Sequence, residues 1–418
     1  MDNGDLMSAS LVDASLELDV NATELTYDGE LSIDTLLSEA LHTIRKHMGM
    51  DAAFISEFSD GMRIFRHLDC NENAPPLEVG DSDPLDQSYC QRVVDGRLPE
   101  VIHDASVLPE ALDLTATKEL PVRAHISVPI YLSDGRIYGT FCCFSTRHHR
   151  NLNKRDLNVM KMFADFSGKQ IERYLTYRYQ DRIFRKRIQS VITEKRFASF
   201  FQPIFRISDQ RILGYEALTR FSAEPIRPPN VWFSEAEEVG LQEELELAAI
   251  ESALDHFHQL PVDAYLALNV SPATIKKQKL HGILRRFPLN RLVLEITEHA
   301  SIDDYGQLLE SLAPLRDKGL ALAVDDAGAG YSTFTHILEL NPDIIKLDRS
   351  LILNIHENQK SRALAAALVK FADETGSKII AEGIENKEEL ETLAEINVRK
   401  AQGFYLGRPM PIDRLFRH

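Results

Sequence analysis

Residues 320–348 read LALAVDDAGAGYSTFTHILELNPDIIKLD, and the pattern of this stretch indicates how the chain folds. The apolar run Leu320–Asp325 ends in an aspartate and is followed at once by a second one, Asp326. After a glycine-rich turn and a helical segment, the apolar run Ile344–Asp348 begins. Short apolar runs that alternate with helical segments are typical of parallel strands covered on both faces. The stretch therefore predicts a strand, a helix and a second strand, with two carboxylates at the end of the first.

The same alternation continues on both sides of this stretch, from Phe197 to the C-terminus. We expect eight strands, at Phe200–Phe205, Ile212–Thr219, Tyr265–Val270, Leu292–Thr297, Leu320–Asp325, Ile344–Asp348, Ile379–Glu382 and Ala401–Leu406. Eight strands with intervening helices in a segment of this length predict an α/β fold, a (β/α)₈ TIM-like barrel rather than an open sheet. Because only a turn around Asp209 joins the first two strands, the first is predicted to run antiparallel to the second.

Polar or charged residues lie at the ends of seven of these strands. They are Glu216, Asn269, Glu295, Asp325 with Asp326, Lys346, Glu382 and Gln402. The carboxyl ends of parallel barrel strands converge on one mouth, where barrel enzymes have their active sites. A set of carboxylates and an amide, without a matching set of His or Cys, favours a hard cation, Mg²⁺ or Mn²⁺. The adjacent pair Asp325–Asp326 predicts a site for two such ions.

A two-metal site of this kind suits phosphodiester hydrolysis. One ion would acidify a water, while the other, with Lys346 and Arg220, would stabilise the charge that grows on the phosphoryl oxygens. The small residues of Ala327–Ser332 predict a flexible loop over the mouth. Glu298 is placed to accept hydrogen bonds from the backbone of that loop.

Glu216-Ala217-Leu218, followed by Thr219-Arg220, resembles the signature of the EAL domain, the bacterial cyclic di-GMP phosphodiesterase. The supporting segments are Phe201-Gln202-Pro203, Asn269-Val270-Ser271-Pro272, Glu295-Ile296-Thr297-Glu298, Asp325-Asp326, Lys346-Leu347-Asp348, Ala381-Glu382-Gly383-Ile384-Glu385 and Gln402-Gly403-Phe404. The resemblance covers residues 197–418 and implies cleavage of cyclic di-GMP to linear pGpG. The chain departs from the family at Ala327, where Phe is common, and at Ala329, where Thr is common, which bears on turnover rate and loop order more than on chemistry.

The resemblance also implies a role for each matched residue. The implied metal ligands are Glu216, Asn269, Glu295 and Asp325 for the first ion, with Asp325 and Asp326 sharing the second. The implied catalytic residues are Glu216, Lys346, which would orient the attacking water, and Glu382, a base or a metal ligand through water. The implied nucleotide contacts are Gln202, Leu218, Arg220 and Gln402, and the supporting residues are Glu298 and Glu385.

Residues 32–174 are predicted to form a separate α+β domain that resembles a GAF domain. Apolar residues at helical spacing after Ile33 precede a hairpin of two strands, 52–58 and 62–68, and the strands 124–132 and 137–144 flank a Ser-Asp-Gly turn. Such domains bind small ligands or serve as dimerising spacers, and no residue set here selects one ligand. Cys90 is interpreted as a structural cysteine in preference to a chromophore attachment or a redox thiol.

The connection between the two domains admits two interpretations. A helix from Lys154 to about Val191 either links the domains and pairs with a copy of itself, or caps the first domain and gives way to a charged linker. The domain division places a helical linker at 175–196. Residues 1–31 contain eight acidic residues and no Lys or Arg, which predicts a disordered tail. The long helix and the tail suggest a homodimer.

Composition excludes several classes of function. The 418 residues carry a net charge of −17, which disfavours binding to nucleic acid polymers or to anionic membranes. No apolar run reaches the ~18 residues of a membrane span, and the N-terminus is acidic, so we expect a cytoplasmic protein. The spacing of the four cysteines, Cys70, Cys90, Cys142 and Cys143, predicts neither zinc binding nor a disulfide framework.

The leading hypothesis is a cyclic di-GMP phosphodiesterase that the first domain regulates. The alternatives are a receptor that holds cyclic di-GMP without cleaving it and signals to a protein partner, and an enzyme for another phosphodiester. The complete set of matched catalytic positions disfavours the receptor. No Gly-Gly-Asp-Glu-Phe-like segment appears, so a coupled cyclase is not expected.

Overall fold

The computed structural model describes residues 32–297, 302, 304–327 and 332–416. The chain divides into two compact units, with the boundary between Tyr179 and Gln180. The predicted tail, residues 1–31, lies outside the described residues. None of the helices in the described ranges is both long and apolar enough to cross a membrane.

The first unit is an α+β domain built on one antiparallel sheet with the strand order β3-β2-β1-β6-β5-β4. Its strands are β1 (Ala52–Ser59), β2 (Met62–Cys70), β3 (Ser82–Pro84), β4 (Val101–Ile102), β5 (Ala124–Tyr131) and β6 (Ile137–Ser145). Its helices are α1 (Ile33–Met48), α2 (Tyr89–Val94), α3 (Pro109–Leu112), α4 (Thr115–Glu119) and the first part of α5 (Lys154–Thr193). Both expected strand pairs, β1 with β2 and β5 with β6, are present.

Local sequence signals set the ends of α1. The backbone N–H of Thr35 donates to Ser32 Oγ at 3.2 Å, which satisfies one of the free donors of the first turn. At the other end Gly49 has a φ of 64°, a left-handed conformation in which glycine ends helices without strain. The apolar spacing between these caps gives the helix one face that packs on the sheet.

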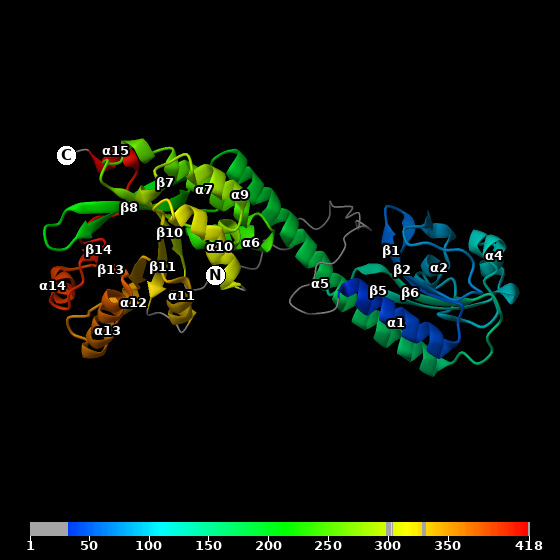
Figure 1. Ribbon diagram of the computed structural model, residues 1–418. Coiled ribbons are helices and arrows are strands. Elements are labelled where there is room, and N and C mark those ends of the chain that lie inside the picture. Colours follow the sequence, from blue (N-terminus) through cyan, green and yellow to red (C-terminus); the bar gives the residue numbers. More distant parts are fainter. Residues whose placement is uncertain (1–31, 298–301, 303, 328–331, 417–418) are drawn as a thin grey trace, which may run out of the picture. The chain divides into compact units, whose positions relative to one another are not determined.

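Helices cover both faces of this sheet. On one face α1 and the first part of α5 lie side by side (Figure 1), with Leu41 and Met160 in the same apolar cluster. On the other face α2 packs Cys90 against residues that include Cys142. Side chains alternate along a strand. The neighbours Cys142 and Cys143 therefore lie on opposite faces of the sheet.

The second unit is a closed eight-stranded barrel in the order β10-β11-β12-β13-β14-β7-β8-β9, and it confirms the predicted fold class. Its strands are β7 (Phe197–Arg206), β8 (Ile212–Phe221), β9 (Tyr265–Asn269), β10 (Leu292–Ile296), β11 (Ala321–Ala327), β12 (Ile344–Leu347), β13 (Lys378–Ala381) and β14 (Lys400–Ala401). As predicted, β7 runs antiparallel to β8, and it is also antiparallel to β14. The predicted strand Ala401–Leu406 is wrong beyond its first residue, because β14 ends at Ala401.

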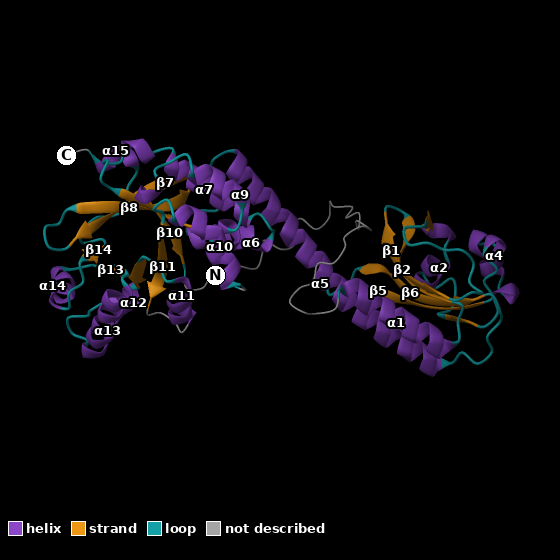
Figure 2. Cartoon of the chain, viewed as in Figure 1, coloured by secondary structure: helices purple, strands orange, loops and turns teal. Residues whose placement is uncertain are grey.

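Helices surround the barrel strands (Figure 2). They are α6 (Pro229–Glu238), α7 (Gln242–Leu254), α8 (Pro272–Ile275), α9 (Gln278–Leu284), α10 (Tyr305–Arg316), α11 (Ser332–Leu340), α12 (Arg349–Ile352), α13 (Gln359–Thr375), α14 (Lys387–Glu395) and α15 (Ile412–Leu415). A small cluster of strand side chains, including Ile204, Ala267 and Ile380, forms one apolar layer, and a larger cluster fills the space between strands and helices. The two layers make the barrel a packed core rather than a pore.

α5 is one continuous helix of 40 residues, which confirms the helix predicted from Lys154 to about Val191. Its first part packs Met160 into the core of the first unit. Near its end, Ile188 and Val191 are buried in a cluster with Trp232 of the second unit. The helix therefore combines the two interpretations of the sequence, since it caps the first unit and continues into the second. The homodimer stays a prediction.

Candidate active site

Successive barrel strands carry polar side chains to one end of the barrel. The residues are Glu216 on β8, Asn269 on β9, Glu295 on β10, Asp325 on β11 and Lys346 on β12, with Glu382 and Gln402 directly after β13 and β14. Register aligns them, because Asn269 pairs with Glu295 across the parallel strands β9 and β10. Glu216 lies midway along β8, and the other side chains sit at or near the carboxyl ends of their strands, so the barrel gathers them into one layer.

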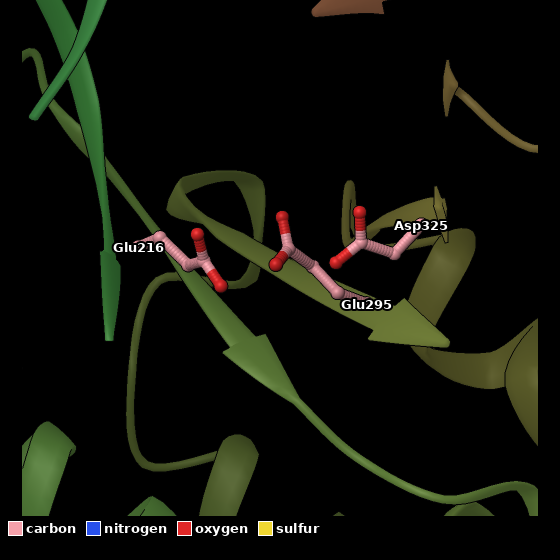
Figure 3. Close-up of side chains that lie close together, drawn as sticks. All are labelled: Glu216, Glu295 and Asp325. Atoms are coloured by element: carbon pink, nitrogen blue, oxygen red, sulfur yellow. The ribbon is translucent and has the colours of Figure 1, made fainter. Parts of the chain in front are cut away.

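Lys346 lies at the centre of this group. Its side chain is fully buried, and its Nζ lies 2.7 Å from Glu382 Oε1, 2.9 Å from Glu295 Oε2 and 3.0 Å from Asp325 Oδ2. Glu216 Oε2 is 3.6 Å away. Figure 3 shows the carboxylates of Glu216, Glu295 and Asp325 turned toward one another. The structure thus brings together four of the acidic residues that the sequence singled out.

A chain of amide side chains fixes the orientation of Glu216. Asn269 Nδ2 donates to Glu216 Oε1 at 3.0 Å, and Gln402 Nε2 donates to Glu216 Oε2 at 2.6 Å. Gln402 Nε2 also contacts Gln202 Oε1 at 3.1 Å, and Gln202 in turn donates to the backbone oxygen of Gly407. Gln402 Oε1 is buried and has no hydrogen-bond partner within the described ranges, so this atom is free to accept from a bound group.

The group has more carboxylates than cations, and this excess of negative charge contributes to shifts in the pKa values of its members. Burial raises the pKa of Glu295 to about 8, although Lys346 opposes the shift, and Glu216 adds to it. Burial likewise raises the pKa of Glu382 well above its ordinary value. Against the effect of burial, Lys346 and the hydrogen-bonding amides lower the pKa of Glu216. The surrounding carboxylates hold the pKa of Lys346 well above its ordinary value despite burial. One lysine cannot neutralise four carboxylates, so the group favours additional cations.

Two sets of carboxylates are arranged so that each can hold a metal ion. One set is Glu216, Glu295 and Asp325, and the other is Asp325, Asp326 and Glu382; within each set the ligand atoms lie within 4.8 Å of one another. Asp325 belongs to both, as expected of a bridging ligand between two ions. All the donors are oxygen atoms, the chemistry that hard divalent cations prefer. The residues present therefore fit a pair of such ions.

The backbone explains how two consecutive aspartates join one set. In a regular strand their side chains would face opposite sides. Asp326 has a φ of 58°, in the left-handed region, and the register between β11 and β12 shifts between Val324 and Ala327. This irregularity breaks the alternation and brings both carboxylates to the same place. Non-glycine residues with such strain are concentrated at functional sites.

A cavity of about 630 Å³ adjoins the carboxylates on the side of β8 and β9. Its lining includes Glu216 and Asn269, together with the predicted nucleotide contacts Leu218 and Arg220. Arg220 Nη1 donates to the backbone oxygen of Thr219. The cavity is large enough for a ligand of nucleotide size.

Of the two predicted supporting residues, Glu385 is described by the structure and does not join the group. Glu385 is exposed and bonds to Arg349 at 2.5 Å, outside the carboxylate sets. Glu298 lies outside the described residues, as does Ala329 of the loop after the paired aspartates.

The sequence reasoning missed Glu246 of α7. This carboxylate is buried and lines the cavity, and its Oε2 accepts from Ser271 N at 3.0 Å and from Ser271 Oγ at 2.9 Å. It thereby fixes the turn that follows Asn269. The available signal was a carboxylate between two leucines, Leu245 and Leu247, in a helical pattern, because a buried acid requires a partner.

Comparisons with known families agree with this geometry. Residues 185–409, more than half of the chain, match the family model of the EAL domain. The chain belongs to the EAL family. Residues 32–171 match the GAF domain model. The resemblances stated for both parts of the sequence are therefore confirmed.

Several proteins resemble this EAL protein. An uncharacterized signaling protein of Caulobacter vibrioides is 28% identical over 312 residues, which are 71% of this chain and 37% of that protein. The cyclic di-GMP phosphodiesterase RocR of Pseudomonas aeruginosa is 30% identical over 226 residues, 51% of this chain and 58% of RocR. An EAL domain protein from Listeria monocytogenes shares the fold with a TM-score of 0.50 and 25% identity, over 55% of this chain and 95% of that one. The chain thus spans less than two thirds of the length of either curated relative.

Proposed function

We propose that this chain is a metal-dependent phosphodiesterase that hydrolyses cyclic di-GMP to linear pGpG. The observation that carries the proposal is the convergence of Glu216, Glu295, Asp325 and Glu382 on Lys346 beside a cavity of nucleotide size. Membership of the EAL family and the similarity to RocR, a cyclic di-GMP phosphodiesterase, support the choice of substrate.

The two sets of carboxylates would hold two divalent ions, Mg²⁺ or Mn²⁺, with Asn269 completing the first set. When bound, such ions supply Lewis-acid stabilisation to a phosphoryl group and lower the pKa of water. Around them, Lys346 keeps a positive charge at the centre of the group, where it orients the attacking water and offsets developing negative charge. Glu382, 2.7 Å from Lys346 Nζ, is placed to accept a proton at its carboxylate.

The cavity residues would bind the nucleotide. Arg220 provides a cation for a phosphate, and Leu218 provides an apolar surface beside it. Gln202 and Gln402 connect the nucleotide side of the site to Glu216 through their hydrogen bonds.

The test is to mix the full chain with cyclic di-GMP and either Mg²⁺ or Mn²⁺ and to follow pGpG by chromatography. We expect Glu216→Gln to lower turnover at least about a hundredfold, because it removes a charged ligand and an anchor of the amide network. Glu389→Gln is the matched control, since Glu389 is also buried in the same domain, while among the described residues its carboxylate accepts from the backbone N–H groups of Asn354 and Glu385 and joins no carboxylate set. Its turnover should stay close to that of the wild type.

The outcomes separate the competing functions. Nucleotide binding by folded protein without pGpG under either metal would support the receptor instead. Cleavage of other phosphodiesters at similar rates, in a panel of cyclic and linear dinucleotides, would contradict the assigned substrate. Wild-type turnover by Glu216→Gln would overturn the metal assignment.

We also propose that the GAF domain regulates this activity. The residues of the site come from β7 to β14, from α7 and from the turns that follow the strands, so the second unit contains the chemistry. The comparison is between the full chain and the fragment 180–418, which keeps Ile188 and Val191 because both are buried against Trp232. Different turnover per barrel is expected, and equal turnover would make the GAF domain a spacer.

A further inference from the structure

Two cysteine thiols lie in contact inside the GAF domain. Cys90 on α2 and Cys142 on β6 are 52 residues apart, and their Sγ atoms are 3.5 Å apart. Both side chains are fully buried, and both thiols are free. A disulfide requires an S–S distance of about 2.05 Å. The two sulfur atoms therefore need to approach each other by about 1.5 Å to form the bond.

Polar groups surround this thiol pair. Arg63 Nη1 lies 3.6 Å from Cys90 Sγ, while Ser127 Oγ and Thr140 Oγ1 lie 3.0 Å and 3.1 Å from Cys142 Sγ. Ser56 Oγ contacts Thr140 and is 3.9 Å from Cys90 Sγ. The pair belongs to an apolar cluster, but its contacts with these polar groups distinguish it from a structural cysteine that is inert in purely apolar packing.

Charge distinguishes the two thiols from each other. Burial alone would raise the pKa of Cys90, but the contact with Cys142 and the charge of Arg63 outweigh burial and lower this pKa to about 6. Burial raises the pKa of Cys142 well above its ordinary value, and the neighbouring Cys90 adds to the shift. The pair thus has one sulfur that favours the thiolate, the nucleophilic form, and one that stays a thiol.

The other two cysteines lack this arrangement. Cys143 follows Cys142 but lies on the opposite face of the sheet, where burial raises its pKa and its Sγ lies 3.9 Å from the sulfur of Met160. Cys70 is exposed at the end of β2, and partial desolvation of its thiol, together with the charge of Asp69, raises its pKa. Cys143 is therefore a control matched in burial, and Cys70 a control with solvent access.

We propose that Cys90 and Cys142 form a dithiol that hydrogen peroxide oxidises to a disulfide joining α2 to β6. In the first step the Cys90 thiolate attacks one peroxide oxygen, so that an S–O bond forms, the O–O bond breaks and the departing hydroxide takes a proton to become water. In the second step the sulfur of Cys142 attacks the Cys90 sulfur, an S–S bond forms, the S–O bond breaks, and the thiol proton leaves with the oxygen as water. Two thiols are oxidised and one peroxide is reduced.

The ion pair between Arg63 and Asp83 separates the Cys90 thiol from solvent. Exposure rises from 0% for Cys90 to 4% for Arg63 and to 33% for the side chain of Asp83, whose Oδ1 accepts from Arg63 Nε at 2.9 Å. Opening of this pair uncovers the thiolate to a small oxidant. Bulky alkylating reagents are expected to react with Cys70 long before they reach Cys90.

The experiment treats the reduced full-length protein with hydrogen peroxide, blocks the remaining thiols under denaturing conditions and maps the cysteines by mass spectrometry. Trypsin leaves Cys70 with Cys90 in residues 67–92, and Cys142 with Cys143 in residues 137–147, so the mapping uses a Cys70→Ser, Cys143→Ser double variant. We expect its two remaining thiols to be lost together, with a mass lower by two hydrogen atoms. In the same background, Cys142→Ser should leave Cys90 as a sulfenic acid that a 1,3-diketone traps.

Two results would overturn the proposal. One is that Cys90 and Cys142 of the folded double variant stay reduced under peroxide while the denatured protein reacts. The other is that a Cys90→Ser variant of the wild-type chain forms an intramolecular disulfide as readily as the wild type does. Cys143→Ser alone tests whether replacing any buried cysteine disturbs the fold, and it should oxidise like the wild type. Circular dichroism of each variant confirms that the comparison is between folded proteins.

Discussion

Asp326 shows how one backbone conformation determines the electrostatics of the candidate site. Its left-handed φ of 58° lets two consecutive carboxylates join one metal-binding set. Asparagine tolerates this conformation better than other side chains, whereas alanine in it is strained by about 1–2 kcal/mol. The role of the backbone and the role of the charge can therefore be separated at this position.

We expect Asp326→Asn to keep the fold and to lower metal-dependent turnover by about ten- to a hundredfold, because it removes a charge but preserves the conformation. Asp326→Ala should lower turnover as well and should also lower the free energy of unfolding by about 1 kcal/mol. Steady-state turnover and urea unfolding of both variants provide the check. Full activity in Asp326→Asn would show that the second carboxylate set is not used.

Lys400 is a cation in an electrostatically unfavourable position in the fold. Burial, and then the charges of Lys378 and Arg206, lower its pKa from 10.5 to about 8. Arg206 and Lys400 are also direct partners across β7 and β14, where like charges are destabilising. Between pH 8 and 10.5 the unfolded chain binds more protons at this side chain than the folded chain does. The contribution of Lys400 to the free energy of unfolding therefore becomes less unfavourable as the pH rises from 8 to 10.5. Below pH 8 the destabilisation by Lys400 is fully present.

We expect Lys400→Met to be more stable than the wild type at neutral pH by about 1–2 kcal/mol, after allowance for solvent screening of a partly exposed side chain. The advantage should shrink as the pH rises through 8 toward 10.5. Urea unfolding, followed by the fluorescence of Trp232, the only tryptophan, measures the free energy of unfolding of the barrel. A difference that does not change with pH would contradict the argument.

At the scale of elements, the end of α5 belongs to the barrel. Ile188 is 0% exposed and packs in a cluster with Trp232, and the neighbouring Arg187 Nη1 donates to Glu235 Oε1 at 3.0 Å. We expect Ile188→Ala to lower the free energy of unfolding of the barrel by about 2–4 kcal/mol through the cavity it creates. The control is Lys186→Ala, at an exposed position near Ile188 on the same helix. This change should alter the free energy of unfolding of the barrel by less than about 0.5 kcal/mol. Equal effects of both variants on Trp232 fluorescence would contradict this packing.

The sequence predicted the barrel strands where the apolar runs have the length of a strand. The prediction failed where contacts between distant backbone segments, and not the local apolar pattern, decide where a strand ends. Apolar runs identified all eight barrel strands, yet β14 ends at Ala401 although apolar and aromatic residues continue to Leu406. There the chain leaves the sheet, because Ile384 N donates to Gln402 O and a Cβ on Gly403 would lie 2.1 Å from Ile384 N. Such a close approach is a property of two distant segments, so no local pattern reveals it.

The same distinction applies to the site. Strand ends predicted which residues would converge, since that follows from barrel topology alone. The central position of Lys346, the left-handed Asp326 and the support that Glu246 gives to Ser271 depend on side-chain geometry. The contact between Cys90 and Cys142 depends on how α2 packs on the sheet, and the sequence offered only two separated cysteines.

At the scale of the whole molecule, four acidic residues of this acidic chain are gathered around one buried lysine. The net charge of −17 repels polyanions in general, but the buried carboxylates around Lys346 create a local demand for small cations. Ion binding that occurs only in the folded barrel must stabilise that unit and leave the GAF domain unchanged. The two units therefore provide an internal comparison within one chain.

We expect Mg²⁺ or Mn²⁺, at a hundred times its dissociation constant, to raise the free energy of unfolding of the barrel by about 2.7 kcal/mol. Trp232 fluorescence in urea reports the barrel, and hydrogen exchange of β1 reports the GAF domain, whose protection should not change. Glu216→Gln, which removes a ligand common to the metal set and the amide network, should lose most of the stabilisation. Stabilisation of both units alike, or an undiminished effect in Glu216→Gln, would place the ions elsewhere on this acidic protein, because general screening acts on all exposed charges while a site acts through its ligands.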